Sequence, residues 1–370
     1  MDEIPLARPD VTQREIDAVV AVLETPDLSL GPKLDEFERR FAEYCGTAQA
    51  VACSSGTAAL HLLVRAFGIG PGHEVITTPF SFVASANCAL FEGARPVFAD
   101  IDADTWNIDP RRVAAAVTDR TKAVIPVDVF GQVADLDPIL ELARSRGLKV
   151  IEDSCEAVGG RYKGKRAGSI GDAGTFGFYP NKQITTGEGG MIVTDDEDVA
   201  GLVRSMRNQG RGTDGGWLAH CRLGYNFRLS DINCALGIVQ LERIDEILAN
   251  RRRVAELYLK RLADETRVRT QRIIDDVEMS WFVFVVRLAD EYAPQARDEI
   301  LVRLREEGIG CSNYFAPIHL QPFYVEQFGY REGDFPVAEA LSARTIALPF
   351  HAGLTESDID RVCTSLQRLL

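Results

Sequence analysis

A lysine and an aspartate are the residues of this sequence whose types and settings could do covalent chemistry. Lys182 lies in "FGFYPNKQITTGEGGMIV", just before a glycine-rich turn and an apolar run. A lysine amine can trap a carbonyl group when its surroundings favour the neutral form. Asp153 ends the apolar run "KVIED", where a buried carboxylate costs free energy unless it meets a cation or hydrogen-bond donors. Taken alone, Lys182 could be a solvated surface residue and Asp153 a helix cap or ion-pair partner.

Two further features extend this pair into a possible cofactor site. In "SSGTAAL", Gly56 and Thr57 open a helix after an apolar run, which is the geometry that offers backbone N–H groups to a phosphate. Phe82 follows another apolar run and could stack on an aromatic ring. Alone, the first is also an ordinary helix cap and the second an ordinary core residue. Jointly they predict a pyridoxal phosphate site, in which Lys182 holds the aldehyde as a Schiff base and Asp153 keeps the ring nitrogen protonated.

The elements that must position these residues alternate between strands and helices up to about residue 230. Short apolar runs such as "AVAC" and "EVIT" are separated by helical patterns. An earlier helical pattern, before these runs, opens with Thr12 and Glu15 in capping-box spacing. This predicts an α/β fold with a mainly parallel sheet covered on both faces. In such sheets ligands bind beyond the carboxyl ends of the strands, where Asp153 is expected.

From about residue 230 the pattern changes to a long helix, the strand "SWFVFVVRL" and further helices. We therefore expect a large cofactor-binding domain over residues 1–245 and a smaller α+β domain over residues 246–370. The arginines at 251–253 are expected on a solvated helix face.

Composition narrows the class of protein. The chain of 370 residues is 46% hydrophobic and carries a net charge of −14, which argues against nucleic acid or an anionic membrane as partners. The eight cysteines form no CxxC pair and the five histidines are scattered, so we expect reduced thiols and no metal site. No apolar run reaches the roughly 18 residues that span a membrane. These features predict a cytoplasmic globular protein.

Several ordered blocks resemble the sugar aminotransferases of the DegT/StrS family, which have the aspartate aminotransferase fold (fold type I of the pyridoxal phosphate enzymes). They include "SSGTAALHLLVRAFGIGPGHEVI", "VIEDSCEAVGGRYKGKRAGSIGDAG", "YPNKQITTGEGGMIV" and "LGYNFRLSDINCALG". The resemblance implies that Lys182 binds the cofactor covalently, that Asp153 pairs with its ring nitrogen and that Phe82 stacks on its ring. It places Gly56 and Thr57 at the phosphate, and it implies a homodimer in which Asn226 reaches the phosphate in the neighbouring subunit.

Two positions depart from the pattern of that family. Gly177 replaces a serine that often helps to hold the phosphate, and Glu156 stands where glutamine or histidine is common. A carboxylate beside the ring oxygen would be repelled unless it is protonated or paired with a cation, and otherwise it would turn away. His319 and Tyr314 lie in the block "NYFAPIHLQPFY", which the resemblance brings towards the substrate.

The resemblance implies transfer of an amino group from L-glutamate to a keto group at C3 or C4 of a deoxysugar carried on a nucleoside diphosphate. Lys33, Arg207, Arg211 and Arg228 are cations that could meet the pyrophosphate. A keto-cyclitol of the scyllo-inosose type is an alternative acceptor. A non-catalytic regulatory protein with the same fold is a further alternative. A sugar dehydratase branch resembles these enzymes but carries histidine in place of the lysine, so Lys182 argues against it.

Overall fold

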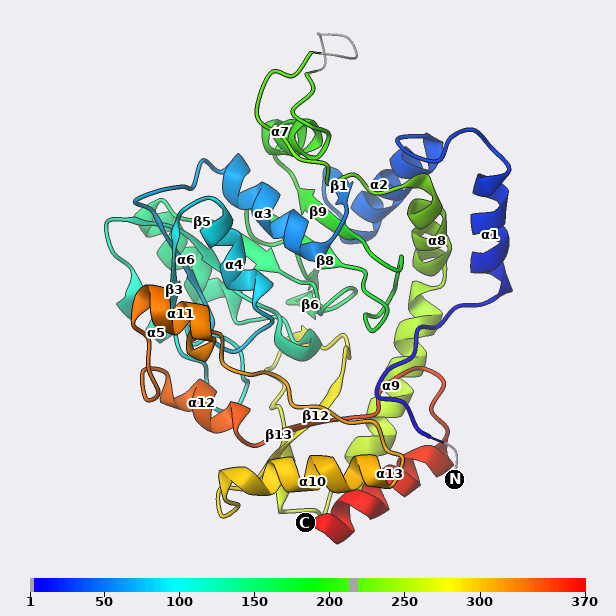
Figure 1. Ribbon diagram of the computed structural model, residues 1–370, viewed down its shortest axis with the longest axis vertical. Helices are drawn as coiled ribbons and strands as arrows, with labels where there is room; N and C mark the ends of the chain where they lie inside the picture. Colours follow the sequence, from blue (N-terminus) through cyan, green and yellow to red (C-terminus); the bar gives the residue numbers. More distant parts are fainter. Residues whose placement is uncertain (1–2, 213–218) are drawn as a thin grey trace.

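A seven-stranded sheet forms the centre of the protein, whose computed structural model describes residues 3–212 and 219–370 (Figure 1). Its order is β1-β9-β8-β5-β4-β2-β3. The strands from β8 to β3 are paired in parallel, whereas β9 runs antiparallel to both β1 and β8. The mainly parallel α/β sheet predicted from the apolar runs is therefore confirmed. The strands are β1 (Gln49–Cys53), β2 (Glu74–Thr77), β3 (Arg95–Phe98), β4 (Thr121–Ile125), β5 (Lys149–Asp153), β8 (Ala173–Gly177) and β9 (Gly190–Thr194).

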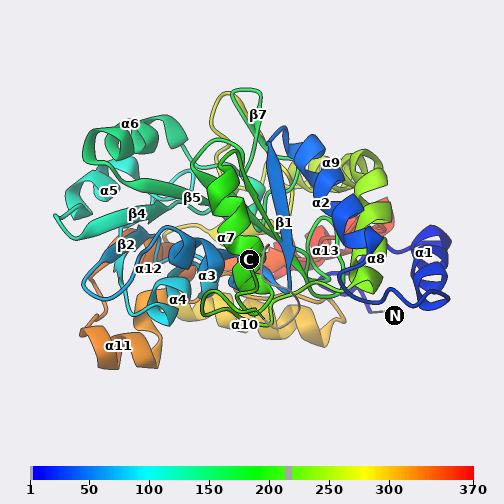
Figure 2. The ribbon, with the colours of Figure 1, turned by 90° about the horizontal axis from the view of Figure 1, so that it is seen from above.

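Helices cover both faces of this sheet because successive side chains of each strand point to opposite sides. Val51 and Ile192 face the cluster under α3, whereas Ala52 and Met191 face the cluster under α2. Figure 2 shows α5 and α6 on one side of β2, β4 and β5, with α3 and α4 on the other. The helices packed on the sheet and its edge are α1 (Gln13–Leu23), α2 (Pro32–Cys45), α3 (Gly56–Ala66), α4 (Ala84–Phe91), α5 (Pro110–Ala116), α6 (Leu136–Arg146), α7 (Glu197–Arg207) and α8 (Asp231–Glu242).

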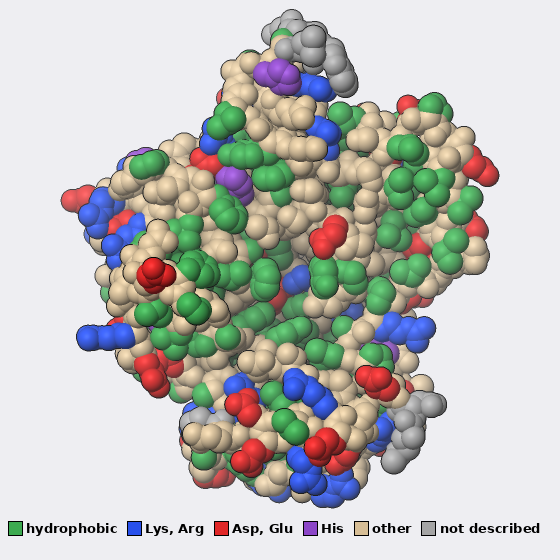
Figure 3. Space-filling view, in the orientation of Figure 1, with side chains coloured by type: hydrophobic (Ala, Val, Ile, Leu, Met, Phe, Trp, Pro, Cys, Tyr) green, Lys and Arg blue, Asp and Glu red, His purple; other side chains and the backbone are tan. Residues whose placement is uncertain are grey.

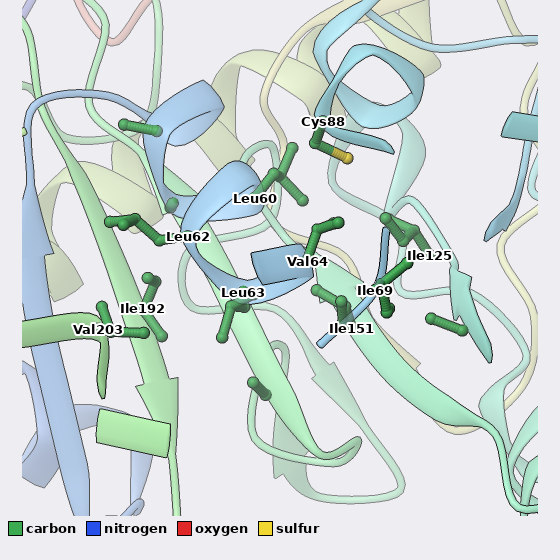
Figure 4. Close-up of a cluster of buried hydrophobic side chains, with 14 of the residues drawn as sticks. Leu60, Leu62, Leu63, Val64, Ile69, Cys88, Ile125, Ile151, Ile192 and Val203 are labelled. Carbon is green, nitrogen blue, oxygen red and sulfur yellow. The ribbon is translucent and has the colours of Figure 1, made fainter. Parts of the chain in front are cut away.

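Helix α3 is held rigidly, which matters because its first turn belongs to the predicted phosphate site. Its central residues are all buried, and Leu62 and Leu63 point towards Ile192 and Val203 (Figure 4). Burying a leucine side chain of this kind stabilises the fold by about 1.5–3 kcal/mol. The first turn of α3 is thus fixed by the core beneath the rest of the helix.

The C-terminal part of the chain builds a second core around a three-stranded sheet. That sheet has the order β10-β12-β13, and α10 and α13 cover it at the lower end of Figure 1. A small sheet, β11-β6-β7, joins residues of the two parts. The remaining elements are β6 (Arg161–Tyr162), β7 (Lys165–Arg166), α9 (Ile244–Arg261), β10 (Val268–Thr270), β11 (Val277–Glu278), β12 (Phe284–Leu288), α10 (Pro294–Glu306), α11 (Pro322–Phe328), α12 (Pro336–Ser342), β13 (Thr345–Leu348), α13 (Glu356–Leu369) and the 3₁₀ turns η1 (Val129–Gly131) and η2 (Ile318–Leu320).

The first described residues pair with this C-terminal part. Ile4 exchanges backbone hydrogen bonds with Gly308 and Gly310, and the N–H of Phe350 donates to the carbonyl oxygen of Leu6. A division at residue 245 remains a prediction, and these bonds attach residues 4–6 to the smaller part of the chain.

Arg251 corrects the expectation that the arginines at 251–253 share a solvated face. Arg252 and Arg253 are exposed, but Arg251 is buried and donates to the carbonyl oxygens of Trp281 and Phe282 at 2.8 and 2.6 Å. Three consecutive helical residues span most of a turn, so one of them must face inward. The guanidinium group of Arg251 satisfies carbonyl groups beside the candidate site.

Glu15 and Arg243 form a buried ion pair that holds α1 against the start of α9. Arg243 and Gln240 donate to Glu15 at 2.7 and 2.9 Å, and the predicted capping box with Thr12 is present. Burial alone would raise the pKa of Glu15, but hydrogen bonds from Thr12, Arg243 and Gln240 outweigh burial and lower it to about 2.

The substitution Glu15→Gln is expected to lower the free energy of unfolding at pH 7 by about 1–3 kcal/mol, because it removes the buried carboxylate partner of Arg243, which keeps only Asp10 at 3.0 Å and Glu246 at 3.3 Å. The native pKa of Glu15 is depressed, so its contribution is complete above its usual pKa of 4.5 and is lost as the pH falls towards 2. The difference from wild type, measured by denaturant unfolding, should therefore shrink over that range. Glu24→Gln, at an exposed position ending the same helix, should show neither effect. A pH-independent difference would contradict this account.

Candidate active site

The carboxyl ends of several strands meet where the predicted residues lie. Asp153 is the last residue of β5, Lys182 lies between β8 and β9, and Gly56 follows β1. A Cβ atom on Gly56 would stand 2.8 Å from the sulfur of Cys155 and 3.4 Å from the Cα of Gly177. The first turn of α3, the segment after β5 and the end of β8 therefore converge. Figure 3 shows a hollow in the middle of this face of the molecule, with a lysine or arginine side chain deep inside it.

Asp153 is held by neutral donors. The residue is buried, at 4% exposure, and its carboxylate accepts hydrogen bonds from the Ser85 hydroxyl at 2.6 Å and from the Cys155 N–H at 3.3 Å. Neither donor carries a positive charge, and each carboxylate oxygen can accept more than one bond. A buried carboxylate in this state is suited to a cationic ligand group, such as a protonated ring nitrogen.

Lys182 is anchored by its own loop and faces a carboxylate. Its backbone N–H donates to the carbonyl oxygen of Tyr179, and its side chain is 15% exposed. The Nζ atom lies 3.5 Å from Oε1 of Glu156 and 4.0 Å from the centre of the Phe282 ring. The lysine therefore reaches inward and is not a surface residue.

Glu156 turns towards the lysine. Its Oε2 accepts from the backbone N–H of Phe130 at 2.9 Å. Burial raises the pKa of Glu156 above its ordinary value, and the positive charge of Lys182 and the Phe130 N–H partly oppose that rise. Burial and then the charge of Glu156 raise the pKa of Tyr314, whereas a hydrogen bond with Asn181 partly opposes that rise.

The remaining predicted residues differ in their settings. Phe82 follows β2 and precedes Ser85 by three residues, and the residue is 62% exposed, which leaves its ring open to a ligand. Gly56 and Thr57 form the first turn of α3 with Ser55 as N-cap, so their N–H groups precede the first intrahelical bond. Asn226 is exposed, and its backbone pairs with that of Asn208, away from the residues around Lys182.

His319 lies apart from this group. Its side chain is fully buried, it pairs with Glu339 at 2.9 Å, and it packs against Phe98 and Phe335. Burial lowers the pKa of His319. In this setting the imidazole serves the packing of η2, and we do not carry His319 forward as a substrate contact.

The cations expected to be available for a pyrophosphate are mostly engaged. Arg207 is buried and bonds to Glu38, and Lys33 pairs with Glu36 at 2.8 Å. Arg228 is half-buried and donates to Asn208. Among these three residues, Arg228 is the one whose partner is an uncharged amide and not a carboxylate.

Three residues of the site carried no signal that singled them out in the sequence. Ser85 follows Phe82 by three residues, and a small polar side chain in the first turn of a helix could have been linked to a strand-end carboxylate. Phe130 presents its N–H from a backbone with φ of 60°, which its residue type does not indicate. Phe282 lies just before β12 in the smaller part of the chain, and it reaches Lys182 from a sequence distance that no local pattern reveals.

The pyridoxal phosphate predicted from the sequence can be tested against this geometry. That group needs an amine, an anion for its ring nitrogen, donors for its phosphate and a surface for its ring. The partly exposed amine of Lys182, the buried carboxylate of Asp153, the first turn of α3 and the exposed ring of Phe82 fit those needs. A Cβ at Gly177 would make only ordinary contacts of 3.6 Å or more, so the backbone leaves room for the serine that the family often has at this position.

The chain is similar to known aminotransferases over nearly its whole length. The model of the DegT/DnrJ/EryC1/StrS aminotransferase family matches residues 9–367. GDP-perosamine synthase of Caulobacter vibrioides is 42% identical over 372 residues, which cover 100% of this chain and 99% of that protein. The spore coat polysaccharide biosynthesis protein SpsC of Bacillus subtilis is 41% identical, covering 99% and 97%. A putative sugar aminotransferase of Streptococcus pneumoniae, Spr1654, solved in a PLP-form, is 30% identical with a TM-score of 0.94, covering 100% of both chains.

The mainly parallel α/β fold and these relatives define a pyridoxal phosphate-dependent enzyme of the aspartate aminotransferase type. The chain belongs to the DegT/DnrJ/EryC1/StrS aminotransferase family. It is a transaminase that uses pyridoxal 5′-phosphate, as the resemblance of its motifs implied.

Proposed function

We propose that this enzyme moves an amino group from L-glutamate to a keto group of a deoxysugar linked to a nucleoside diphosphate. The observation that carries the proposal is that Lys182 reaches inward to Glu156, three residues after the aspartate that ends β5, in a chain 42% identical to GDP-perosamine synthase. That relative is named for a nucleotide-linked amino sugar, and SpsC is named for polysaccharide biosynthesis. An amino sugar destined for a polysaccharide or glycoside is the product we assign.

In this proposal each residue of the site has one task. Pyridoxal phosphate, when bound, supplies an aldehyde to carry the amino group and a ring that accepts electrons. Lys182 holds the aldehyde carbon and, when released, moves a proton at its Nζ atom. Asp153 holds a proton on the ring nitrogen, and Ser85 orients Asp153.

The other residues bind and orient. Phe82 packs on the ring, the N–H groups of Gly56 and Thr57 meet the phosphate, and Tyr314 lines the substrate side. Glu156 contacts the Lys182 end of the site.

Most of the cysteines are buried free thiols, which suits our assignment of the enzyme to the cytoplasm. Across residues 3–212 and 219–370 no helix has both the length and the apolar character needed to cross a membrane.

Absorption spectroscopy tests the proposed reaction. The protein loaded with pyridoxal phosphate should show a visible band that L-glutamate removes and D-glutamate leaves unchanged. One nucleoside diphosphate keto sugar from a panel should restore the band. Restoration by a keto-cyclitol and by no sugar nucleotide would contradict the sugar assignment, and a band unaffected by any amino donor would contradict the transaminase assignment.

We also propose that two chains share their active sites, with Asn226 of each reaching the phosphate bound to the other. Mixing Lys182→Ala with Asn226→Ala subunits should then restore activity, because a mixed dimer contains one site with both residues intact. With equal amounts of the two variants, random pairing gives about a quarter of the wild-type number of intact sites. Activity of the unfolded and refolded mixture, compared with each variant alone, provides the measurement. No gain on mixing would contradict shared sites.

A further inference from the structure

A largely buried carboxylate, that of Glu92, holds the segment that carries Asn226. Glu92 caps the C-terminal end of α4, and its side chain is 12% exposed. Its Oε1 accepts from the Tyr225 hydroxyl at 2.8 Å and lies 2.7 Å from Nε2 of His61 on α3. Its Oε2 accepts from Arg65, also on α3, at 2.8 Å. Glu92 therefore joins Tyr225 to both α3 and the end of α4.

The protonation states favour this arrangement at neutral pH. Burial alone would raise the pKa of Glu92, but its hydrogen bonds and the positive charge of Arg65 outweigh burial and lower that pKa. Burial and then the hydrogen bond to Glu92 raise the pKa of Tyr225 to about 12. The phenol thus keeps its proton and donates it to an ionised carboxylate. Hydrogen bonds of this charge-assisted kind are roughly twice as strong as neutral ones.

The backbone is bonded on both sides of Asn226. The N–H groups of Tyr225 and Phe227 donate to the last two carbonyl oxygens of α7, at 2.6 and 2.9 Å. The carbonyl oxygen of Phe227 accepts from the N–H of Ser54, just before α3, at 2.8 Å. Asn226 therefore stands on a short extended segment that is fixed at each end.

The side chains of this segment alternate between two sides. The rings of Tyr225 and Phe227 stack with their centres 4.8 Å apart, and both pack against the imidazole of His61. Successive side chains of an extended segment point in opposite directions. Asn226, which is exposed, is therefore directed away from α3 and from the core of its own chain.

We propose that Glu92 is a positioning residue for the active site of the neighbouring subunit. By fixing Tyr225, it sets the place from which Asn226 reaches the phosphate bound to the other chain. This inference rests on the shared active sites proposed above. Without the carboxylate, the hydroxyl of Tyr225 and the guanidinium group of Arg65 lose their common acceptor. Loss of Glu92 should then weaken cofactor binding in the partner and leave the site in the same chain intact.

Helix α4 offers a rival route for the same residue. Its first turn carries Ser85, which donates to Asp153, so a disturbance at Glu92 could travel along the helix to the site of its own chain. The two routes differ in which subunit loses affinity for the cofactor. A measurement that assigns the loss to one subunit decides between them.

Two hybrid dimers, purified through different affinity tags on their two chains, make that assignment. Each contains one Lys182→Ala chain, so only one site in each dimer forms an adduct that borohydride reduces. The first hybrid carries Glu92→Gln on the Lys182→Ala chain, and the second carries it on the other chain. The dissociation constant for pyridoxal phosphate, measured from the mass of the reduced adduct, should rise in the first hybrid alone. We expect a rise of about three- to tenfold, the effect of weakening one hydrogen bond.

Two further variants control this comparison. Glu141→Gln, at an exposed position on α6, should leave both hybrids with the wild-type constant. Tyr225→Phe removes only the hydroxyl that Glu92 holds, so it should repeat the pattern even if Glu92→Gln does not fold. A rise in the second hybrid, an equal rise in both, or no rise in either would overturn the proposal.

The same pair of hybrids with Asn226→Ala in place of Glu92→Gln tests the shared sites themselves. If Asn226→Ala weakens binding in the first hybrid and Glu92→Gln does not, only the role of Glu92 is refuted. If Asn226→Ala has no effect there, or if two tagged wild-type chains do not purify together, the shared sites are refuted. Absence of the reduced adduct at saturating cofactor would refute the attachment to Lys182 and, with it, the proposed function.

Discussion

Replacing Lys182 with alanine is expected to lower the rate of transamination by about 10⁴-fold or more. The residue supplies both the covalent hold on the cofactor and the proton transfers at the reacting carbon, and each role alone is typically worth several powers of ten. The rate constant kcat, measured with saturating pyridoxal phosphate, gives the size of the effect. The same variant should show no added mass after borohydride reduction.

Lys122→Ala is the matched control for that experiment. Lys122 is exposed on β4 of the same sheet, so its loss should leave kcat and the mass of the reduced adduct unchanged. Wild-type activity in Lys182→Ala, or an adduct that remains in it, would show that another residue binds the cofactor.

Replacing Asp153 with asparagine is expected to lower kcat by about 10³-fold. Asparagine has nearly the same shape but no negative charge, so the proton on the ring nitrogen loses its partner in a site where water is largely excluded. The loaded variant should still carry the cofactor on Lys182, because that bond does not involve Asp153. Activity and adduct mass together therefore distinguish a loss of chemistry from a loss of binding.

Ser85→Ala separates the charge of Asp153 from its orientation. The variant removes the 2.6 Å hydrogen bond to Asp153 and keeps the carboxylate, so we expect a loss in kcat of about tenfold or less. If Ser85→Ala were as damaging as Asp153→Asn, the position of the carboxylate and not its charge would be the decisive property.

The sequence predicted the parts of this molecule that depend on local pattern. Capping residues such as Thr12 and Ser55 stand where helices begin, and the apolar run that ends at Asp153 is a buried parallel strand. Because strand ends of a parallel sheet meet at one edge, Asp153 and Gly56 could be placed near each other without coordinates. The resemblance to a family then picked out Lys182 among the lysines of the chain.

What could not be predicted depends on side-chain direction and on contacts between distant segments. Arg251 looked like its exposed neighbours, and only the position of α9 against residues 281–282 turns it inward. His319 lies in a block that resembles a substrate loop, yet Glu339 and aromatic rings enclose it. Whether Glu156 faced the lysine or turned away depended on the backbone at Phe130, where the residue type gives no hint of a positive φ.

The pairing of the first described residues with the C-terminal part has a consequence for how the chain is made. Ile4 leaves the ribosome before its partners Gly308 and Gly310, which are synthesised some three hundred residues later. During translation at about 5–20 residues per second, this segment must wait many seconds for its partners. The seven-stranded sheet can close in the meantime, since all its strands lie between Gln49 and Thr194. A fragment that starts at residue 246 would lack its edge partner, and the smaller core would be completed only when both ends of the chain are present.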